Sequence, residues 1–259
     1  MVLSKNVQSI SRAINILEKL IYSDKGLGVT EISNSLAIKK STTHRILSTL
    51  VNHGYVVQDE NSKYKVGLKF FEVGSVAINK LDLRNDVRPF LKEIRDKTNE
   101  TVHLGLLDNN HVLYIDKVES LKTVRMFSEI GRKIEPHCTS LGKVLLAYSP
   151  DKVVEDIIDN GLIKYTGNTI IEPDKLKEHL KEVRINGYAI DDEEQLMGVR
   201  CIAGPIFNYE GEVIASFSIT GPLIRMGKEK IKELSKLIKQ YSVIISRSFG
   251  YIRNNDERI

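Results

Sequence analysis

The sequence contains few cysteines and no long hydrophobic run, and both absences exclude classes of protein. Cys138 and Cys201 are the only cysteines among 259 residues, too few for a disulfide framework or for a zinc module built on paired cysteines. No apolar stretch approaches the roughly 20 residues that a membrane-spanning helix requires. The N-terminal stretch "MVLSKNVQSISRAINILEKL" lacks the continuous apolar core and small-residue cleavage site of a signal peptide. We therefore expect a protein of the reducing cytoplasm that does not enter a membrane.

The composition is that of a globular protein, and its charge is unevenly placed. Hydrophobic residues make up 41% of the chain and charged residues 28%, enough of each for a buried core and a solvated surface. A chain of this length favours two domains. Residues 1–75 hold 10 Lys and Arg against 6 Asp and Glu, whereas residues 76–259 hold 28 of each. The whole positive excess therefore lies in the N-terminal segment, which suggests contact with a polyanion.

The N-terminal segment has the pattern of a winged helix-turn-helix. Apolar residues recur at helical spacing over 10–21, with Ser9 as the expected N-cap, and Thr30 is expected to cap a second helix. A third helix ends at Gly54, and two short strands at 55–58 and 63–66 follow it as a hairpin. One face of the third helix is expected to be buried, at Thr43, Ile46, Leu47 and Leu50.

The other face of the third helix carries cations and short hydroxyls. A recognition helix enters the major groove by its N-terminal end, where such side chains reach base edges and phosphates. Arg45 can donate two hydrogen bonds to a guanine edge, and the lysines would mainly neutralise phosphates. The alternative is a solvated helix in a winged helix that docks on another protein. The predicted DNA contacts are Lys39, Lys40, Ser41, Thr42, His44, Arg45, Ser48, Lys63 and Lys65.

The rest of the chain mixes hairpins with helices. Residues 68–87 read as a connecting helix, and Pro89 is well placed as the first residue of the next one. Hairpins mixed with helices predict an antiparallel α+β domain rather than a regular βαβ array. The expected hairpins lie at 101–118 and 201–220, a further strand at 123–127, and helices at 139–148, 150–159, 173–187 and 227–249.

These segments together resemble the IclR family of bacterial transcriptional regulators. The resemblance rests on "VQSISRAINILEKL", "VTEISNSLAIKKSTTHRILSTLVNHGYV" and "KYKVGLKFFEVG", followed by "ETVHLGLLD", "VLYIDKVES", "TSLGKVLLA", "GYAIDDEEQLMGVRCIAGPIF" and "GEVIASFSITGP". Each piece alone is a weak pattern, but their number, order and spacing make the match specific. It implies an α+β protein with a winged helix-turn-helix DNA-binding domain at 6–67, a linker helix at 68–87 and a GAF-like effector-binding domain at 88–251.

The resemblance also implies a function. Members are regulators, more often repressors than activators, that bind a double-stranded, pseudo-palindromic operator as homodimers or homotetramers. Their effectors are mostly small organic, sugar or aromatic acids, and no cofactor or metal is implied. Carried over by position, the effector pocket would be lined by Ser140, Leu141, Gly142, Asp191, Cys201, Ser218 and Thr220.

Those positions also make chemical sense. Residues 140–143 are expected to form the first turn of a helix, where unpaired backbone N–H groups can bind a carboxylate. Ser218 and Thr220 are two residues apart on a strand and so point to one face. Asp191 would repel a carboxylate but accept a hydrogen bond from a ligand hydroxyl. Leu141 stands where many relatives carry a smaller residue.

Three sharper patterns are better explained by structure than by catalysis or metal binding. The adjacent pair His137–Cys138 lacks an orienting group, and Cys201 is expected to be a small buried side chain. The "GK" at 142–143 is not a phosphate loop, because the required earlier glycine is replaced by His137. An enzyme tethered to DNA stays open as an alternative that turnover of a bound acid would support.

The acidic run at 191–194 is the remaining candidate for a metal site. Four consecutive acids are usually a solvated or helix-capping cluster, and the spacing is not that of a calcium loop. His103 and His111 lie in strand-like segments and are expected to be structural or surface residues. We therefore expect no metal site.

Overall fold

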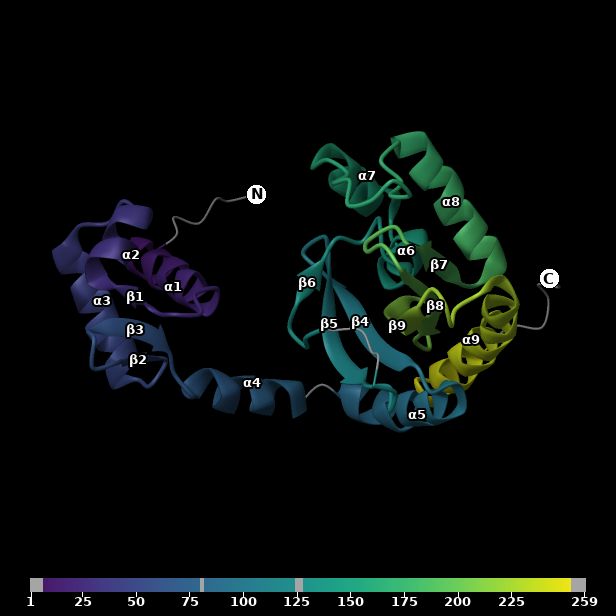
Figure 1. Cartoon of the computed structure of the whole chain (residues 1–259), viewed down its shortest axis with the longest axis horizontal. Coiled ribbons are helices and arrows are strands. Elements are labelled where there is room, and N and C mark those ends of the chain that lie inside the picture. Colours follow the sequence, from purple (N-terminus) through teal and green to yellow (C-terminus); the bar gives the residue numbers. More distant parts are fainter. Residues whose placement is uncertain (1–6, 80–81, 124–127, 253–259) are drawn as a thin grey trace. The chain divides into compact units, whose positions relative to one another are not determined.

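The structure is a computed structural model that describes residues 7–79, 82–123 and 128–252. Its internal contacts divide the chain into two compact units, residues 1–80 and 81–259. Both are drawn in Figure 1. Among the described helices, none combines the length and the apolar content that crossing a bilayer requires.

The N-terminal unit is a winged helix-turn-helix, as predicted. Its elements are α1 (Gln8–Ile21), β1 (Leu27–Gly28), α2 (Val29–Ser35), α3 (Lys40–Asn52), β2 (Val56–Gln58), β3 (Lys63–Val66) and α4 (Lys69–Asn79). The core joins all three N-terminal helices to the sheet through Ile16, Leu20, Ile32, Leu47 and Tyr64. A hydrogen bond fixes the turn between α2 and α3, because the Ser33 hydroxyl donates to the carbonyl of Ile38, 2.5 Å away.

Some details of this unit differ from expectation. The sheet has three strands in the order β1-β3-β2, because the two-residue β1 pairs with β3 beside the predicted hairpin. Helix α1 begins after Val7 without a side-chain cap, so the Ser9 cap is wrong. The Thr30 cap is also wrong, since α2 begins at Val29 and the Gly28 amide donates to Glu31 at 2.6 Å.

The connecting segment contains two helices, and Pro89 does not start either of them. Helix α4 ends at Asn79, and α5 (Asp82–Thr98) runs through Pro89. A proline inside a helix removes one backbone hydrogen bond, but apolar side chains on both sides of it pack on the same core. Val87, Leu91 and Ile94 are fully buried, whereas Pro89 itself is exposed to solvent. Packing of this face outweighs the lost bond, so the predicted helix start is wrong.

The C-terminal unit is an antiparallel six-stranded sheet with helices on both faces. The sheet order is β6-β5-β4-β9-β8-β7. The strands are β4 (Thr101–Asp108), β5 (His111–Val118), β6 (Lys133–Ile134), β7 (Ala189–Asp192), β8 (Val199–Phe207) and β9 (Val213–Pro222). The remaining helices are α6 (Ser140–Ala147), α7 (Asp151–Asp159), α8 (Pro173–Asn186) and α9 (Lys228–Ser248). Both predicted hairpins and all four predicted helices are confirmed, while residues 124–127 of the expected strand lie outside the described residues.

The two faces of this sheet have separate cores, and the functional site lies on one of them. Helices α5 and α9 cover the first face, where Leu91, Ile238 and Phe217 belong to one buried cluster. Helix α6 packs on the second face with α8 beside it, in a cluster that includes Val144 and Leu180 (Figure 1). Because side chains alternate along a strand, every second residue of β4, β8 and β9 points toward α6.

Candidate functional site

The exposed face of α3 presents the predicted DNA contacts to solvent. Thr43 and Leu47 are buried, as expected from their spacing. Lys39, Lys40, Ser41, His44 and Arg45 are exposed, and Thr42 and Ser48 are half-buried. The first turn of α3 carries no acidic residue, and no side chain caps its N-terminus. The backbone N–H groups of such an end are ready to meet a phosphate.

The lysines of the wing are less free than those of α3. Lys63 and Lys65 lie on β3 and are half-buried. The Lys65 ammonium lies 2.9 Å from the carboxylate of Asp59. Its hydrogen bond holds the pKa of Asp59 below the ordinary value. Part of the Lys65 charge is therefore neutralised within the wing itself, so Lys63 is the stronger candidate for a phosphate contact.

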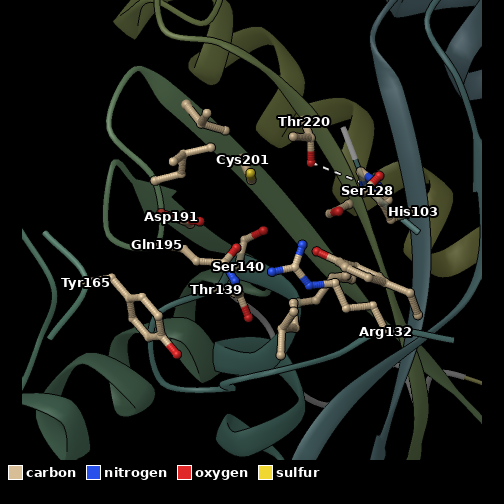
Figure 2. A pocket seen from close by; sticks show the side chains of 16 residues that line it. His103, Ser128, Arg132, Thr139, Ser140, Tyr165, Asp191, Gln195, Cys201 and Thr220 are labelled. Atoms are coloured by element: carbon tan, nitrogen blue, oxygen red, sulfur yellow. Dashed lines mark hydrogen bonds between the residues drawn. The ribbon is translucent and has the colours of Figure 1, made fainter. Parts of the chain in front are cut away.

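The C-terminal unit contains a partly open cavity of about 190 Å³ between the sheet and the start of α6 (Figure 2). This is comparable with the roughly 150 Å³ of an apolar protein cavity that accepts benzene, so the space suits a small organic molecule. Unlike that cavity, this one has a polar lining. The lining residues are His103, Tyr114, Ser128, Arg132, Ile134, Thr139, Ser140, Leu141, Tyr165, Asp191, Gln195, Leu196, Val199, Cys201, Ser218 and Thr220.

The register of the sheet explains why distant residues meet in this cavity. His103 of β4 lies opposite Ser218 of β9, and Cys201 of β8 lies opposite both Asp191 of β7 and Thr220 of β9. All five therefore project from the same face of neighbouring strands. Six of the seven positions expected from the family resemblance line the cavity, and Gly142 is the exception.

Gly142 lies beside the cavity and has a structural role. Thr139 caps α6, and its hydroxyl accepts a hydrogen bond from the Gly142 amide at 3.1 Å. A Cβ atom at residue 142 would lie 2.2 Å from the carbonyl oxygen of Pro136. Only glycine allows the first turn of α6 to lie this close to the preceding loop, and that approach holds Ser140 and Leu141 at the cavity wall.

His103 is a cavity residue that the sequence reasoning missed. It was expected to be structural or on the surface, but its Nε2 lies 2.7 Å from the Ser128 hydroxyl and its Nδ1 lies 3.3 Å from that of Thr220. Burial lowers the pKa of His103 to about 3, with the charge of Lys117 adding to the effect. The imidazole is therefore neutral at physiological pH and offers one donor and one acceptor. His111 is half-exposed, with Nδ1 2.9 Å from the carbonyl of Asn109.

The acidic run at 191–194 is not solvated as one cluster, because Asp191 and Glu194 are buried whereas Asp192 is exposed and Glu193 is half-buried. Asp191 is 3% exposed and accepts a hydrogen bond from the Glu194 amide at 2.8 Å. Burial raises the pKa of Asp191 to about 7. Glu194 is buried and forms an ion pair with Lys143, which is fully buried behind the cavity wall. Across the described ranges, no three His, Cys, Asp or Glu side chains gather closely enough to hold a metal ion.

Neither cysteine is an activated thiol, although Cys201, which was expected to be buried, is only half-buried at the cavity wall. Cys138 is buried, and burial raises its pKa to about 12. Burial also raises the pKa of Cys201 well above its ordinary value. His137 points its Nε2 at the carbonyl of Ile163, 3.0 Å away, rather than at a thiol. At neutral pH neither sulfur is a thiolate, so neither is an activated nucleophile.

A winged helix with a cationic exposed face, on one chain with a domain that contains a polar cavity, defines a DNA-binding regulator with a small-molecule sensor. Comparison with known proteins agrees. The family descriptions "IclR helix-turn-helix domain" and "Bacterial transcriptional regulator IclR C-terminal" match residues 9–60 and 75–247. The chain belongs to the IclR family of bacterial transcriptional regulators, which are DNA-binding proteins and not enzymes.

Relatives match along nearly the whole chain. The HTH-type transcriptional regulator KdgR of Escherichia coli K12 is 38% identical over 248 residues, covering 95% of this chain and 94% of that protein. The transcriptional repressor IclR of the same organism is 33% identical over 251 residues, covering 95% and 92%. The crystal structure of Thermotoga maritima IclR is 33% identical with a TM-score of 0.76, covering 95% of this chain and 100% of that one.

Proposed function

We propose that this regulator is a repressor of a catabolic operon and that a small organic or sugar acid weakens its binding to the operator. The observation that carries the proposal is the polar cavity, on the same chain as a recognition helix without acidic residues in its first turn. The similarity to a relative named as a repressor supports the sign of regulation. A protein with this task acts in the cytoplasm, where its DNA lies.

The DNA contacts divide by chemistry. Arg45 reads a guanine edge in the major groove, since its guanidinium can donate two parallel hydrogen bonds. The remaining residues of this surface fix the protein on the phosphates and neighbouring base edges without specifying most of the sequence. They are Lys39, Lys40, Ser41, Thr42, His44, Ser48, Lys63 and Lys65.

The effector lies in the cavity against α6. In the first turn of α6, the Ser140 and Leu141 backbone N–H groups have no acceptor among the described residues, whereas the Gly142 amide donates to Thr139. Asp191, Ser218 and Thr220 accept or donate hydrogen bonds to polar groups of the ligand, and Cys201 contributes a compact apolar surface beside them. Gly142 acts indirectly, by setting the position of the α6 N-terminus.

Release of DNA follows from linkage between the two sites. The working form is a homodimer or homotetramer on a pseudo-palindromic operator, with half-sites about 34 Å apart. An acid that prefers a subunit arrangement in which two recognition helices no longer match this spacing lowers operator affinity. Nearly complete release requires a roughly 10⁴-fold preference of the acid for that arrangement.

Fluorescence anisotropy tests this proposal. The full-length protein is titrated onto DNA from upstream of its own gene at two salt concentrations, with and without hydroxy, keto and sugar acids. We expect tight, salt-sensitive binding that one acid weakens. Binding that an acid strengthens would identify an activator or a corepressor instead. Equal affinity for this DNA and for random DNA would contradict self-regulation.

Replacing Arg45 separates sequence recognition from phosphate contact. Arg45→Ala should weaken operator binding by roughly 1–3 kcal/mol and relax the preference at one base position. Lys40→Ala, by contrast, should weaken binding to operator and random DNA alike and reduce the salt dependence by about one phosphate. If Arg45→Ala causes equal losses on both DNAs, Arg45 contacts only phosphate.

A further inference from the structure

One cation lines the effector cavity within the described part of the chain. Arg132 precedes β6, and it is the sole Lys or Arg among the cavity-lining residues. Arg132 is exposed, and its guanidinium has no hydrogen-bond or ion-pair partner among the residues that the structure describes. Figure 2 shows the side chain reaching into the cavity toward the side where Thr139 and Ser140 lie. Its charge acts on the phenols of Tyr114 and Tyr165, opposing the rise of their pKa values that burial causes.

A guanidinium that faces a partly open cavity, with no partner among the described residues, is a recognition group for a planar anion. It presents parallel N–H donors that match the two oxygens of a carboxylate. On the α6 side, the backbone N–H groups of Ser140 and Leu141 donate to no described group, and they lie at the positive end of the helix dipole. One carboxylate placed between Arg132 and the start of α6 would satisfy both sets of donors.

The strands on the other side of the cavity offer no second cation. Asp191 is the sole acidic residue of the described lining, and the hydroxyls of Ser128 and Thr220 contact the neutral imidazole of His103. Lys143 lies behind this wall, but its ammonium is paired with Glu194. A ligand hydroxyl finds acceptors and neutral donors there. Above about pH 7, where Asp191 is ionised, a second ligand carboxylate would meet its charge with no counter-charge and would lose hydration without compensation.

We infer that Arg132 binds the carboxylate of the effector and that the cavity selects acids with one carboxylate and at least one distant hydroxyl. The inference rests on the proposed function, because it assumes that the cavity holds the effector. It assigns a binding role to Arg132 and makes Asp191 the residue that rejects dicarboxylates.

Calorimetric titration of the full-length protein tests the inference directly. The probes are glycerate, 4-hydroxybutyrate, gluconate and 4-hydroxybenzoate, each compared with its amide and with a dicarboxylate of the same carbon number. Arg132→Met removes the guanidinium, and Arg132→Lys keeps the charge without the paired donors. Lys133→Met is the matched control, because Lys133 is the next residue, is exposed and pairs with Asp108 at 2.8 Å. Asp191→Asn removes the acidic wall.

We expect a hydroxy monocarboxylate to bind wild type and Lys133→Met equally. Loss of a charged hydrogen-bond pair should weaken its binding to Arg132→Met about 10- to 100-fold, with Arg132→Lys between the two. The amide should bind no better to wild type than the acid binds to Arg132→Met. The dicarboxylate should bind wild type poorly and should gain affinity, relative to the monocarboxylate, in Asp191→Asn.

The outcomes separate this inference from the proposed function. Equal affinity of wild type and Arg132→Met for the acid, equal binding of the amide, or a preference of wild type for the dicarboxylate would overturn the inference and leave regulation intact. An acid that binds through Arg132 but leaves operator affinity unchanged would overturn the proposed function and support the inference. If no acid of the panel binds wild type, both are overturned.

Discussion

Asp191 should make the effector domain less stable as the pH rises, and Asp191→Asn should remove that loss. The carboxyl is 3% exposed, and its pKa rises from 3.8 to about 7 because burial disfavours the charged form. The Glu194 amide donates to it, and the charges of Lys143 and Glu194 act on it in opposite directions. Burial is the largest of these effects, so ionising Asp191 costs free energy in the folded protein.

The magnitude and the sign follow from linkage between protonation and folding. A shift of about three pKa units corresponds to up to about 4 kcal/mol, at 1.36 kcal/mol per unit. Between pH 4 and 7 the folded protein binds more protons at Asp191 than the unfolded chain does, so its stability falls with rising pH across that window. The free-energy cost of ionising Asp191 in the folded protein is absent below pH 4 and fully present above pH 7. In Asp191→Asn, the side-chain oxygen can still accept a hydrogen bond from the Glu194 amide, and the side chain does not ionise.

Thermal unfolding of full-length wild type and Asp191→Asn, measured by circular dichroism between pH 4 and 8, tests this reasoning. We expect the variant to unfold about 5–10 °C higher at pH 8, with little difference at pH 4. Asp192→Asn is the control, because Asp192 is exposed on the same strand and pairs with Arg200 at 2.6 Å. Asp192→Asn should lower the free energy of unfolding by no more than about 1 kcal/mol at any pH. A difference between Asp191→Asn and wild type that is the same at pH 4 and pH 8 would refute the reasoning.

Two further substitutions test how the cavity wall is held. Gly142→Ala should destabilise the domain by roughly 1–3 kcal/mol in denaturant unfolding, because the new Cβ would meet the Pro136 carbonyl. Gly167→Ala is the control, since a Cβ there has no atom within 4 Å, and its stability should stay within about 0.5 kcal/mol of wild type. Glu194→Gln should cost about 3–5 kcal/mol, because it leaves the buried Lys143 ammonium without its counter-charge. Lys143→Met combined with Glu194→Leu should recover most of that loss, and failure to recover would show that the pair holds the loop by more than its charge.

The fold could be read largely from local pattern. The hairpins at 101–118 and 201–220 and the recognition helix follow from apolar spacing and turn residues, which act over a few neighbouring positions. Strand β7 was missed because its four residues end in two acids, a pattern typical of a solvated loop. Only pairing with β8 places Asp191 in the interior. Helix α5 likewise continues through Pro89, although a proline usually marks the start of a helix. Packing of apolar side chains on both sides of the proline stabilises the helix by more than the lost hydrogen bond costs.

The cavity was harder to predict than the fold, for a related reason. His103 and Thr220 meet through the register of β4 and β9, and Arg132 enters from a loop before β6. No spacing rule links such residues along the chain. The family resemblance supplied the positions on α6 and β7–β9, but neither His103 nor Arg132 was among them, so their side of the cavity became visible only in three dimensions.

The two candidate sites handle anions in physically different ways. On α3, several exposed cations face water, where each contact is weak and salt screens it, so affinity for DNA depends on many of them acting together. In the cavity, a single exposed guanidinium faces the start of α6, where backbone N–H groups have no acceptor among the described residues, so one carboxylate can pair with both sets of donors. Binding of one acid therefore depends on a few donors held in fixed positions, whereas binding of DNA depends on many weak contacts that salt screens, and this difference lets one chain respond to a small acid and to DNA separately.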